Sequence, residues 1–232
     1  MAVATISVII PVLNEAAAIE TTVSRVKQAI GVEIIVVDGG SKDATVELVE
    51  ALGIKVIPSS PGRAMQMNVG AAAAKGDILL FVHGDSYLPP GYEDLVRFAL
   101  SKPQTIAGAF QLRIDADKFS VRLVEKFVNL RSRFLGMPYG DQAIFLKATV
   151  FEEVGGFPPL PIMEDFELMR RLRRLGKISI VPAKVITSGR RWLKLGVVKT
   201  TLINQVVIVG YFLGISPRKL RNWYQGKMKC KR

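Results

Sequence analysis

Acidic side chains stand at the ends of apolar runs in this 232-residue sequence, and they are its best candidates for chemistry. Glu15 follows the first apolar run, Asp38 ends the second, and Asp85 comes shortly after the fourth. A single acid at such a place is commonly a turn or helix-cap residue. Three acids that meet at one edge of a sheet would instead form a polar site. The spacing therefore predicts a ligand site at that edge.

A further acidic pair, Glu164 and Asp165, begins a helical pattern later in the chain. Carboxylates in the first turn of a helix can simply complement the helix dipole. A carboxylate within hydrogen-bond reach of a hydroxyl group can also act as a general base. On the residues alone, both interpretations stay open.

Apolar runs alternate with helical patterns over the first 82 residues, and this alternation must position the acids. Unbroken β-rich runs are typical of strands buried on both faces of a parallel sheet. Their alternation with helices predicts right-handed βαβ units in an open, doubly wound sheet, where ligands bind beyond the carboxyl ends of the strands. The predicted strands are 6–13, 33–38, 54–58 and 77–82, and the predicted helices are 14–30, 44–52 and 63–75.

The alternation weakens from residue 88 onward. We find no internal repeat and no linker, so we expect one domain followed by a C-terminal extension. The predicted helices of this part are 92–101, 119–134, 148–154 and 164–176, and the predicted strands are 105–114 (one long strand or a pair), 141–147 and 177–181.

Several reaction classes lack their residues here. The single cysteine, Cys230, excludes a disulfide framework within the chain, and the single histidine, His83, excludes a zinc site with two His ligands. The sequence has no Gly-x-Gly-x-x-Gly after its first strand, no Gly-Lys-Ser/Thr loop and no Gly-x-Ser-x-Gly. These absences speak against a dinucleotide oxidoreductase, a P-loop nucleotidase and a serine hydrolase. The start lacks a basic n-region, so we expect a cytoplasmic protein without a signal peptide.

Positive charge collects toward the C-terminal end. The net charge is +12, and residues 166–232 carry 17 Lys and Arg against one acid, Glu167. Such a segment suits an anionic membrane surface, phosphates or nucleic acid, and the lack of interleaved aromatic residues disfavours nucleic acid. The uncharged stretch 202–215 is about five residues too short for a transmembrane span. It is predicted as an interfacial helix with basic flanks, or else as a core helix or a dimer face.

Six short motifs occur in order, and together they resemble the family 2 glycosyltransferases. The motifs are Pro11-Val-Leu-Asn-Glu15, Val37-Asp-Gly-Gly-Ser-Lys-Asp43, Phe81-Val-His-Gly-Asp85, Gly140-Asp-Gln142, Met163-Glu-Asp-Phe-Glu-Leu168 and Arg190-Arg-Trp192. The third, fourth and sixth resemble a small bacterial subfamily often labelled arsenosugar-associated or carotenoid-acid glucosyltransferase-like. The resemblance covers roughly residues 5–195.

For residues 1–195, the resemblance implies the GT-A fold. This fold is a three-layer α/β/α sandwich around a mostly parallel, Rossmann-like sheet. Residues 196–232 then form a basic, apolar C-terminal extension at a membrane surface or in a homodimer.

The resemblance also implies a site for a nucleotide-diphosphate sugar, with UDP as the expected nucleotide. Asp38 would accept a hydrogen bond from uracil, and Asp85 would bind a divalent cation, Mg²⁺ or Mn²⁺. His83 stands where the family has its first metal-site carboxylate, which makes metal dependence a question for this chain. Arg63 would reach the base or phosphate, or cap its helix. The nucleotide-binding set is Pro11, Leu13, Asn14, Glu15, Asp38, Arg63, His83, Gly84 and Asp85.

For catalysis, the resemblance implies Asp165 as general base beside Glu164, with inversion at the sugar. Ser188 occupies the Gln position of the processive Gln-x-x-Arg-Trp motif, which favours transfer of a single sugar. The set assigned to acceptor and diphosphate is Asp141, Gln142, Arg190, Arg191 and Trp192.

The expected acceptor is a hydroxyl or carboxyl group of a lipid-like or small molecule, reached in the cytoplasm or at the cytosolic membrane face. The alternative is a catalytically degenerate nucleotide-binding scaffold at the membrane surface, because the first carboxylate of the metal motif is missing. The presence of both Asp165 and Asp85 favours the enzyme.

Overall fold

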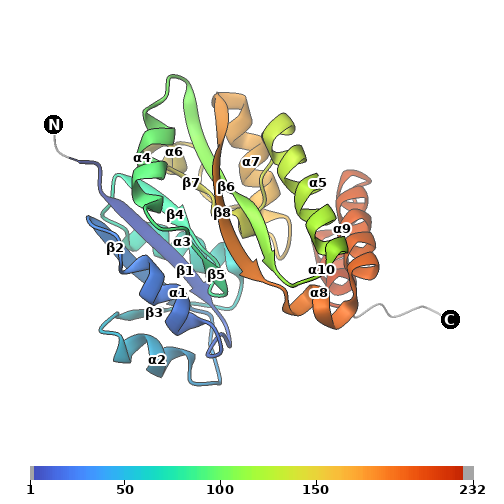
Figure 1. Cartoon of the computed structure of the whole chain (residues 1–232), viewed down its shortest axis with the longest axis horizontal. Helices are drawn as coiled ribbons and strands as arrows, with labels where there is room; N and C mark the ends of the chain where they lie inside the picture. Colours follow the sequence, from blue (N-terminus) through green and yellow to red (C-terminus); the bar gives the residue numbers. More distant parts are fainter. Residues whose placement is uncertain (1–2, 227–232) are drawn as a thin grey trace.

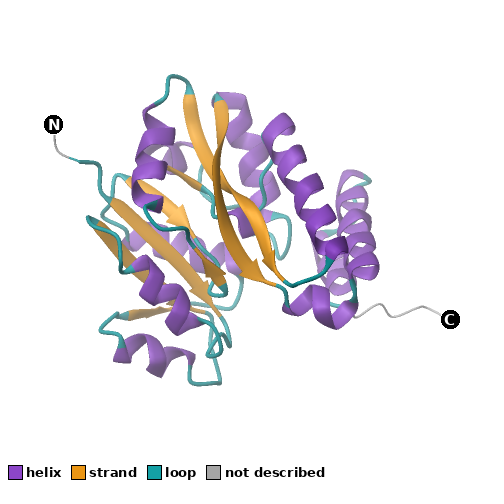
Figure 2. Ribbon diagram, viewed as in Figure 1, coloured by secondary structure: helices purple, strands orange, loops and turns teal. Residues whose placement is uncertain are grey.

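The computed structural model describes residues 3–226, which form an eight-stranded sheet with helices on both faces (Figures 1 and 2). Its first half contains β1 (Ile6–Val12), α1 (Ile19–Val26), β2 (Val32–Asp38), α2 (Thr45–Ala51), β3 (Val56–Pro58), α3 (Arg63–Ala73), β4 (Ile78–Phe81), β5 (Ser86–Tyr87), α4 (Tyr92–Ser101) and β6 (Thr105–Asp115). Its second half contains α5 (Phe119–Leu135), the 3₁₀ turn η1 (Gly140–Gln142), β7 (Phe145–Lys147), α6 (Ala148–Glu153), α7 (Glu164–Leu175), β8 (Lys177–Ser188), α8 (Arg190–Leu195), α9 (Val197–Phe212) and α10 (Pro217–Tyr224).

The strand order is β3-β2-β1-β4-β7-β6-β8-β5. Parallel pairing joins β1 to β2 and β4, β2 to β3, and β6 to β8. Short β7 runs antiparallel to both β4 and β6, and β5 runs antiparallel to β8. The predicted α/β class with a mostly parallel sheet is confirmed, and the carboxyl ends of β1, β2 and β4 do meet at one edge of the sheet.

Two apolar layers cover the two faces because successive strand residues point to opposite sides. Along β1, Val8 and Ile10 join a cluster with Val23 of α1, and α2 and α4 pack into the same layer. Ile9 points the other way, into a cluster with Met67 of α3, and this layer also includes α6, α7, α9 and α10. The three-layer arrangement follows from this alternation.

The structure differs from the predicted elements in several places. The first helix begins at Ile19 instead of residue 14, because Asn14 has a left-handed φ of 57° and the residues that follow form a turn. The predicted strand 141–147 is a 3₁₀ turn followed by β7, with Ala143 at φ 51° between them. Strand β8 continues to Ser188 instead of ending at residue 181. The sequence patterns did not predict β5, α8 or α10.

The last helices pack onto the second apolar layer. Val207 of α9 and Leu220 of α10 are buried in the same cluster as Phe166 of α7. Gly210 lets the two helices come close, since a Cβ there would lie 2.8 Å from a methyl group of Leu220. Over residues 3–226, no helix combines the length and hydropathy needed to cross a bilayer.

Candidate functional site

The turn after β2 is built around Asp38. Its carboxylate accepts hydrogen bonds from the backbone of Gly40 at 2.8 Å and from the hydroxyl of Ser41 at 2.5 Å. Asn14 braces the same turn, because its side chain accepts from the backbone N–H of Lys42 and its own N–H donates to Ser41. Asp38 therefore stabilises the turn itself. Its carboxylate is nearly buried and is held in place by these contacts at the end of the strand.

The loop between β4 and β5 lies against the end of β1. A Cβ at Gly84 would stand 3.1 Å from Val12 and 3.2 Å from Glu15, so glycine favours this close approach. Pro11 is buried beneath it, whereas Leu13 is 45% exposed on the rim. The close contact brings the loop from His83 to Asp85 beside Glu15.

Arg190 joins Glu15 and Asp85 through one nitrogen. Its Nη2 lies 2.6 Å from a Glu15 oxygen and 3.0 Å from an Asp85 oxygen. The N–H of Ser188 also donates to the Asp85 carbonyl at 3.1 Å, which fastens the end of β8 to the loop. Burial raises the pKa of Glu15, while the hydrogen bond from Arg190 lowers it. Two carboxylates here converge on a single positive charge.

Asp165 is held at the start of α7. One carboxylate oxygen accepts from the Gly140 N–H at 2.7 Å, and the other accepts from the Phe166 N–H at 2.7 Å. Met163, with φ 70°, turns the chain into the helix just before it. Nε2 of His83 is close by, since a Cβ at Gly140 would lie 3.1 Å from that nitrogen and 3.3 Å from an Asp165 oxygen.

His83 is a neutral imidazole. Burial holds its pKa well below the usual range, and the charge of Arg63 adds to the effect. Its Nε2 is buried and has no hydrogen-bond partner among the described residues. Buried polar atoms in proteins normally have a hydrogen-bond partner, so this unpartnered nitrogen beside Asp165 is a candidate for contact with a ligand.

Two further acids beside Asp165 are destabilised as anions. Burial, followed by the charge of Asp165, raises the pKa of Glu164 to about 7 and that of Asp141 to about 6. Arg63 lies 3.6 Å from Glu164 and opposes the rise. Oδ1 of Asp141 is buried and has no hydrogen-bond partner among the described residues.

The buried Glu164 predicts a pH-dependent stability. Below pH about 4.5 this residue is protonated in both the folded and the unfolded chain, so the full stability is present. Between pH 4.5 and about 7 only the unfolded chain releases the proton, so the free energy of unfolding falls. Glu164→Gln removes this pH dependence. As the pH rises through that window, the free energy of unfolding of the variant should increase by up to about 3 kcal/mol relative to that of the unmodified chain. Urea titrations of both chains at pH 5 and pH 8 measure the difference between their free energies of unfolding. An equal difference at the two pH values would contradict the interpretation of Glu164 as a buried acid with a raised pKa.

Three residues assigned to the acceptor or diphosphate do other work. Gln142 is fully buried, and its amide accepts from the Ser132 hydroxyl and donates to the Phe110 carbonyl, so in this structure its hydrogen bonds serve the fold. Arg191 turns away to α10, where it donates to the Tyr224 carbonyl at 2.8 Å and stacks on that ring. Trp192 packs against the cluster under α5. Of the Arg-Arg-Trp motif, only the first arginine reaches the site.

The sequence analysis missed Arg131. Its guanidinium lies 3.6 Å over the ring of Tyr139, and its Nε and Nη2 are buried with no hydrogen-bond partner in the described chain. Its positive charge opposes the rise in the pKa of Asp141 that burial and Asp165 cause. No local pattern marks Arg131, although Tyr139, on which it stacks, directly precedes the Gly140-Asp-Gln142 motif.

The donor set suits a hard divalent cation bound together with phosphate oxygens. Among residues 3–226, no three His, Cys, Asp or Glu side chains gather closely enough to hold a metal on their own. Asp85 and Glu15 nevertheless already share a positive charge, that of Arg190. One or two carboxylates completed by phosphate oxygens is an ordinary arrangement for Mg²⁺, and Mn²⁺ accepts the same ligands.

Sequence comparisons identify relatives of the chain. The family model described as Glycosyl transferase family 2 matches residues 7–157. The glucosyl-3-phosphoglycerate synthase of Mycolicibacterium smegmatis is 36% identical over an alignment of 93 residues, and the match covers 35% of this chain and 31% of that protein. An uncharacterized glycosyltransferase of Rickettsia bellii is 34% identical over 111 residues, 47% of this chain and 37% of that protein. The matched stretches thus span only about a third of these relatives.

Solved structures share the fold. A mannosyltransferase from Pyrobaculum calidifontis, in complex with GDP-Man and Mn²⁺, matches 98% of this chain and 70% of its own with a TM-score of 0.70 and 18% identity. Glucosyl-3-phosphoglycerate synthase from Mycobacterium tuberculosis, in complex with Mn²⁺, UDP and glucosyl-3-phosphoglycerate, matches 88% of this chain and 79% of its own with a TM-score of 0.63 and 22% identity. At these identities the likeness shows the fold, which is the expected GT-A arrangement.

Proposed function

Because the chain belongs to glycosyltransferase family 2, we propose that it is an inverting, non-processive glycosyltransferase that uses a nucleotide-diphosphate sugar, with UDP as the nucleotide. The acceptor is a hydroxyl or carboxyl group of a lipid-like or small molecule. The finer assignment, to the arsenosugar-associated or carotenoid-acid glucosyltransferase-like subfamily, belongs to the same proposal.

The loop after β4 carries the proposal, because its two ends reach two different groups of side chains. Asp85 lies against Arg190 and Glu15, and His83 lies beside Asp165. A donor with its diphosphate near Arg190 would therefore have its sugar directed toward Asp165. The pairing of diphosphate and arginine is a strong, charge-assisted contact.

The residues then divide the reaction between them. Asp165 takes the proton of an acceptor hydroxyl, whose oxygen forms a bond to the anomeric carbon on the face opposite the diphosphate. The bond from that carbon to the diphosphate oxygen breaks, and its electron pair leaves with the diphosphate. Asp85 and Glu15 would hold the divalent cation. When bound, the cation would neutralise negative charge on the leaving diphosphate. His83 presents a neutral nitrogen to the donor and does not add a charge.

The relatives support UDP as the nucleotide and Mn²⁺ as the cation. The M. tuberculosis synthase structures contain Mn²⁺ together with UDP or UDP-glucose, whereas the Pyrobaculum enzyme contains GDP-Man and Mn²⁺. Those ligands belong to those proteins, so the choice of base needs a direct measurement on this chain.

Calorimetric titration of UDP, GDP, TDP and UDP-glucose, each with and without Mn²⁺, tests the proposal. We expect Mn²⁺-dependent binding of UDP that is weakened in Asp38→Asn and in Asp85→Asn. Asp94→Asn is a matched control, because this acid is exposed on α4. Tight UDP binding without turnover of any UDP-sugar would favour the degenerate scaffold, and no nucleotide binding under either condition would overturn the donor site.

A further inference from the structure

Helix α5 exposes its largest apolar side chains to solvent. Phe119, Phe127 and Phe134 are 86%, 63% and 75% exposed, and Leu123 and Leu130 lie between them at about half exposure. Their spacing of four, four, three and four residues places all five on one side of the helix. Over 17 residues, about 25 Å, this makes a continuous apolar stripe, which we call the α5 stripe.

The opposite side of α5 is fixed to the protein mainly by polar contacts. Glu125 is buried and accepts from the Ile114 N–H at 2.5 Å, and Asn129 bonds both the N–H and the carbonyl of Leu112. Ser132 donates to Gln142. Since α5 is anchored to β6 in this way, its phenylalanines are not needed for the core. Soluble monomers rarely leave so large an apolar face uncovered.

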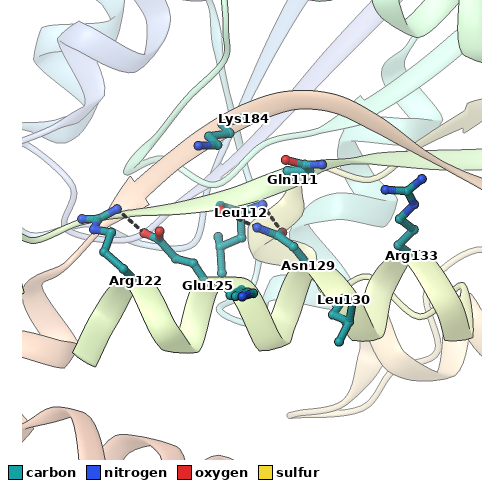
Figure 3. Close-up of a pocket in the computed structure, with 9 residues that line it drawn as sticks. Gln111, Leu112, Arg122, Glu125, Asn129, Leu130, Arg133 and Lys184 are labelled. Atoms are coloured by element: carbon teal, nitrogen blue, oxygen red, sulfur yellow. Dashed lines mark hydrogen bonds and ion pairs between the residues drawn. The ribbon is translucent and has the colours of Figure 1, made fainter. Parts of the chain in front are cut away.

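A basic groove runs beside the α5 stripe, between α5 and the paired strands β6 and β8 (Figure 3). It encloses about 340 Å³ and is lined by four cationic side chains, Arg122, Lys126, Arg133 and Lys184. Its one acid, Glu125, is already paired with Arg122 at 2.6 Å. The groove therefore offers an unbalanced positive charge next to exposed phenylalanines.

We infer that α5 docks the protein on an anionic phospholipid surface, with the α5 stripe among the acyl chains and lipid phosphates in the basic groove. An apolar helix face flanked by Lys and Arg is the pattern of an interfacial helix. Charge decides against a second copy as the occupant, because two such faces would bring together like charges on chains of net charge +12. An anionic bilayer instead complements both the α5 stripe, through its acyl chains, and the basic groove, through its phosphates.

A second stripe supports the same surface. Along α9, exposed Val198, Leu202, Val206, Val209 and Leu213 repeat the spacing of the α5 stripe. Val197, at the start of α9, packs against the same cluster as Val121 of α5, so this end of α9 lies near α5. No Asp or Glu follows Glu167 in the chain, so this region adds no negative charge. This surface shares no residue with the proposed donor site.

Vesicle flotation with the full chain tests the inference. Vesicles of phosphatidylcholine mixed with phosphatidylglycerol should carry the protein, vesicles of phosphatidylcholine alone should carry little, and salt should weaken the binding. Phe127→Ser with Phe134→Ser should lower the partition coefficient, and Lys126→Glu with Arg133→Glu should lower it roughly tenfold for each reversed cation. All four side chains lie at the surface, so these variants should fold, and their UDP affinity should equal that of the unmodified chain.

Phe98→Ser is the matched control, because Phe98 is 64% exposed on α4, which packs into the other apolar layer. Equal loss of vesicle binding in Phe98→Ser and in the α5 variants would overturn the inference. So would binding that is indifferent to lipid charge, or loss seen only when the basic residues of 227–232 are neutralised. A dimer in sedimentation that the α5 variants dissociate would assign the face to a second copy and equally overturn it. Failure of UDP titration with intact vesicle binding would count against the proposed function alone.

Discussion

Asp165→Asn should lower the rate of sugar transfer by about a thousandfold while leaving the affinity for the donor nucleotide nearly unchanged. The asparagine oxygen can still accept from the Gly140 N–H, so the start of α7 should keep its place. What the variant loses is an oxygen basic enough to take the proton of an acceptor hydroxyl. Single-turnover rates with UDP-glucose, measured beside calorimetric UDP affinity, separate the two effects.

Glu164→Gln is the matched control for this substitution. Glu164 lies next to Asp165 but is buried, and it faces Arg63 instead of the Gly140 turn. We expect a loss of transfer of no more than about tenfold. If Glu164→Gln lost as much as Asp165→Asn, the base would have to be reassigned within the pair. Equal loss of turnover and nucleotide affinity in Asp165→Asn would mean that the residue only shapes the site.

Asp85→Asn should lower the transfer rate by about a hundredfold and raise the Mn²⁺ concentration needed for half-maximal activity. A neutral amide holds a divalent cation less firmly than a carboxylate does. Glu15 keeps its contact with Arg190 in this variant, so the arginine should remain in the site to meet the diphosphate. Initial rates across a Mn²⁺ series provide the measurement.

Glu15→Gln serves as the comparison for Asp85→Asn. It also removes one carboxylate from Arg190, but it leaves the loop that carries Asp85 intact. We expect a smaller change in the metal requirement than in Asp85→Asn. Unchanged rates and unchanged Mn²⁺ dependence in Asp85→Asn would refute a metal role for this loop, which already has His83 in place of a first carboxylate.

The first half of the chain was predicted closely because its signals are local. Buried runs such as β1 and amphipathic helices such as α4 show directly in residue order, and the acids at the strand ends meet as the parallel pairing requires. The edge of the sheet that gathers Glu15 and Asp85 was therefore predictable. Arg190, which contacts both acids, was predicted as a site residue only through the resemblance to a known family.

The second half was predicted less well because its contacts are distant in sequence. Strand β8 extends beyond residue 181 because residues 184–188 pair with β6, after a register shift between Phe110 and Gln111. The role of Gln142 in the fold was not predicted, because its partners Ser132 and Phe110 are 10 and 32 positions away in the sequence. Arg131 was missed because it is identified only by the ring of Tyr139, on which it stacks, and by the lack of partners for its nitrogens in the described chain.

The two-residue strand β5 has a consequence for the order in which the molecule is made. It pairs Ser86 with Thr187, a partner 101 positions later, and Arg190 follows three residues after that partner. A ribosome that adds roughly 5–20 residues per second releases the two sides of this pair about ten seconds apart. Until then the loop of Asp85 has neither its second strand nor its arginine. A nascent chain that ends before Arg190 therefore lacks the proposed contact to the diphosphate, and the ability to bind the proposed donor should appear only after Arg190 has been added.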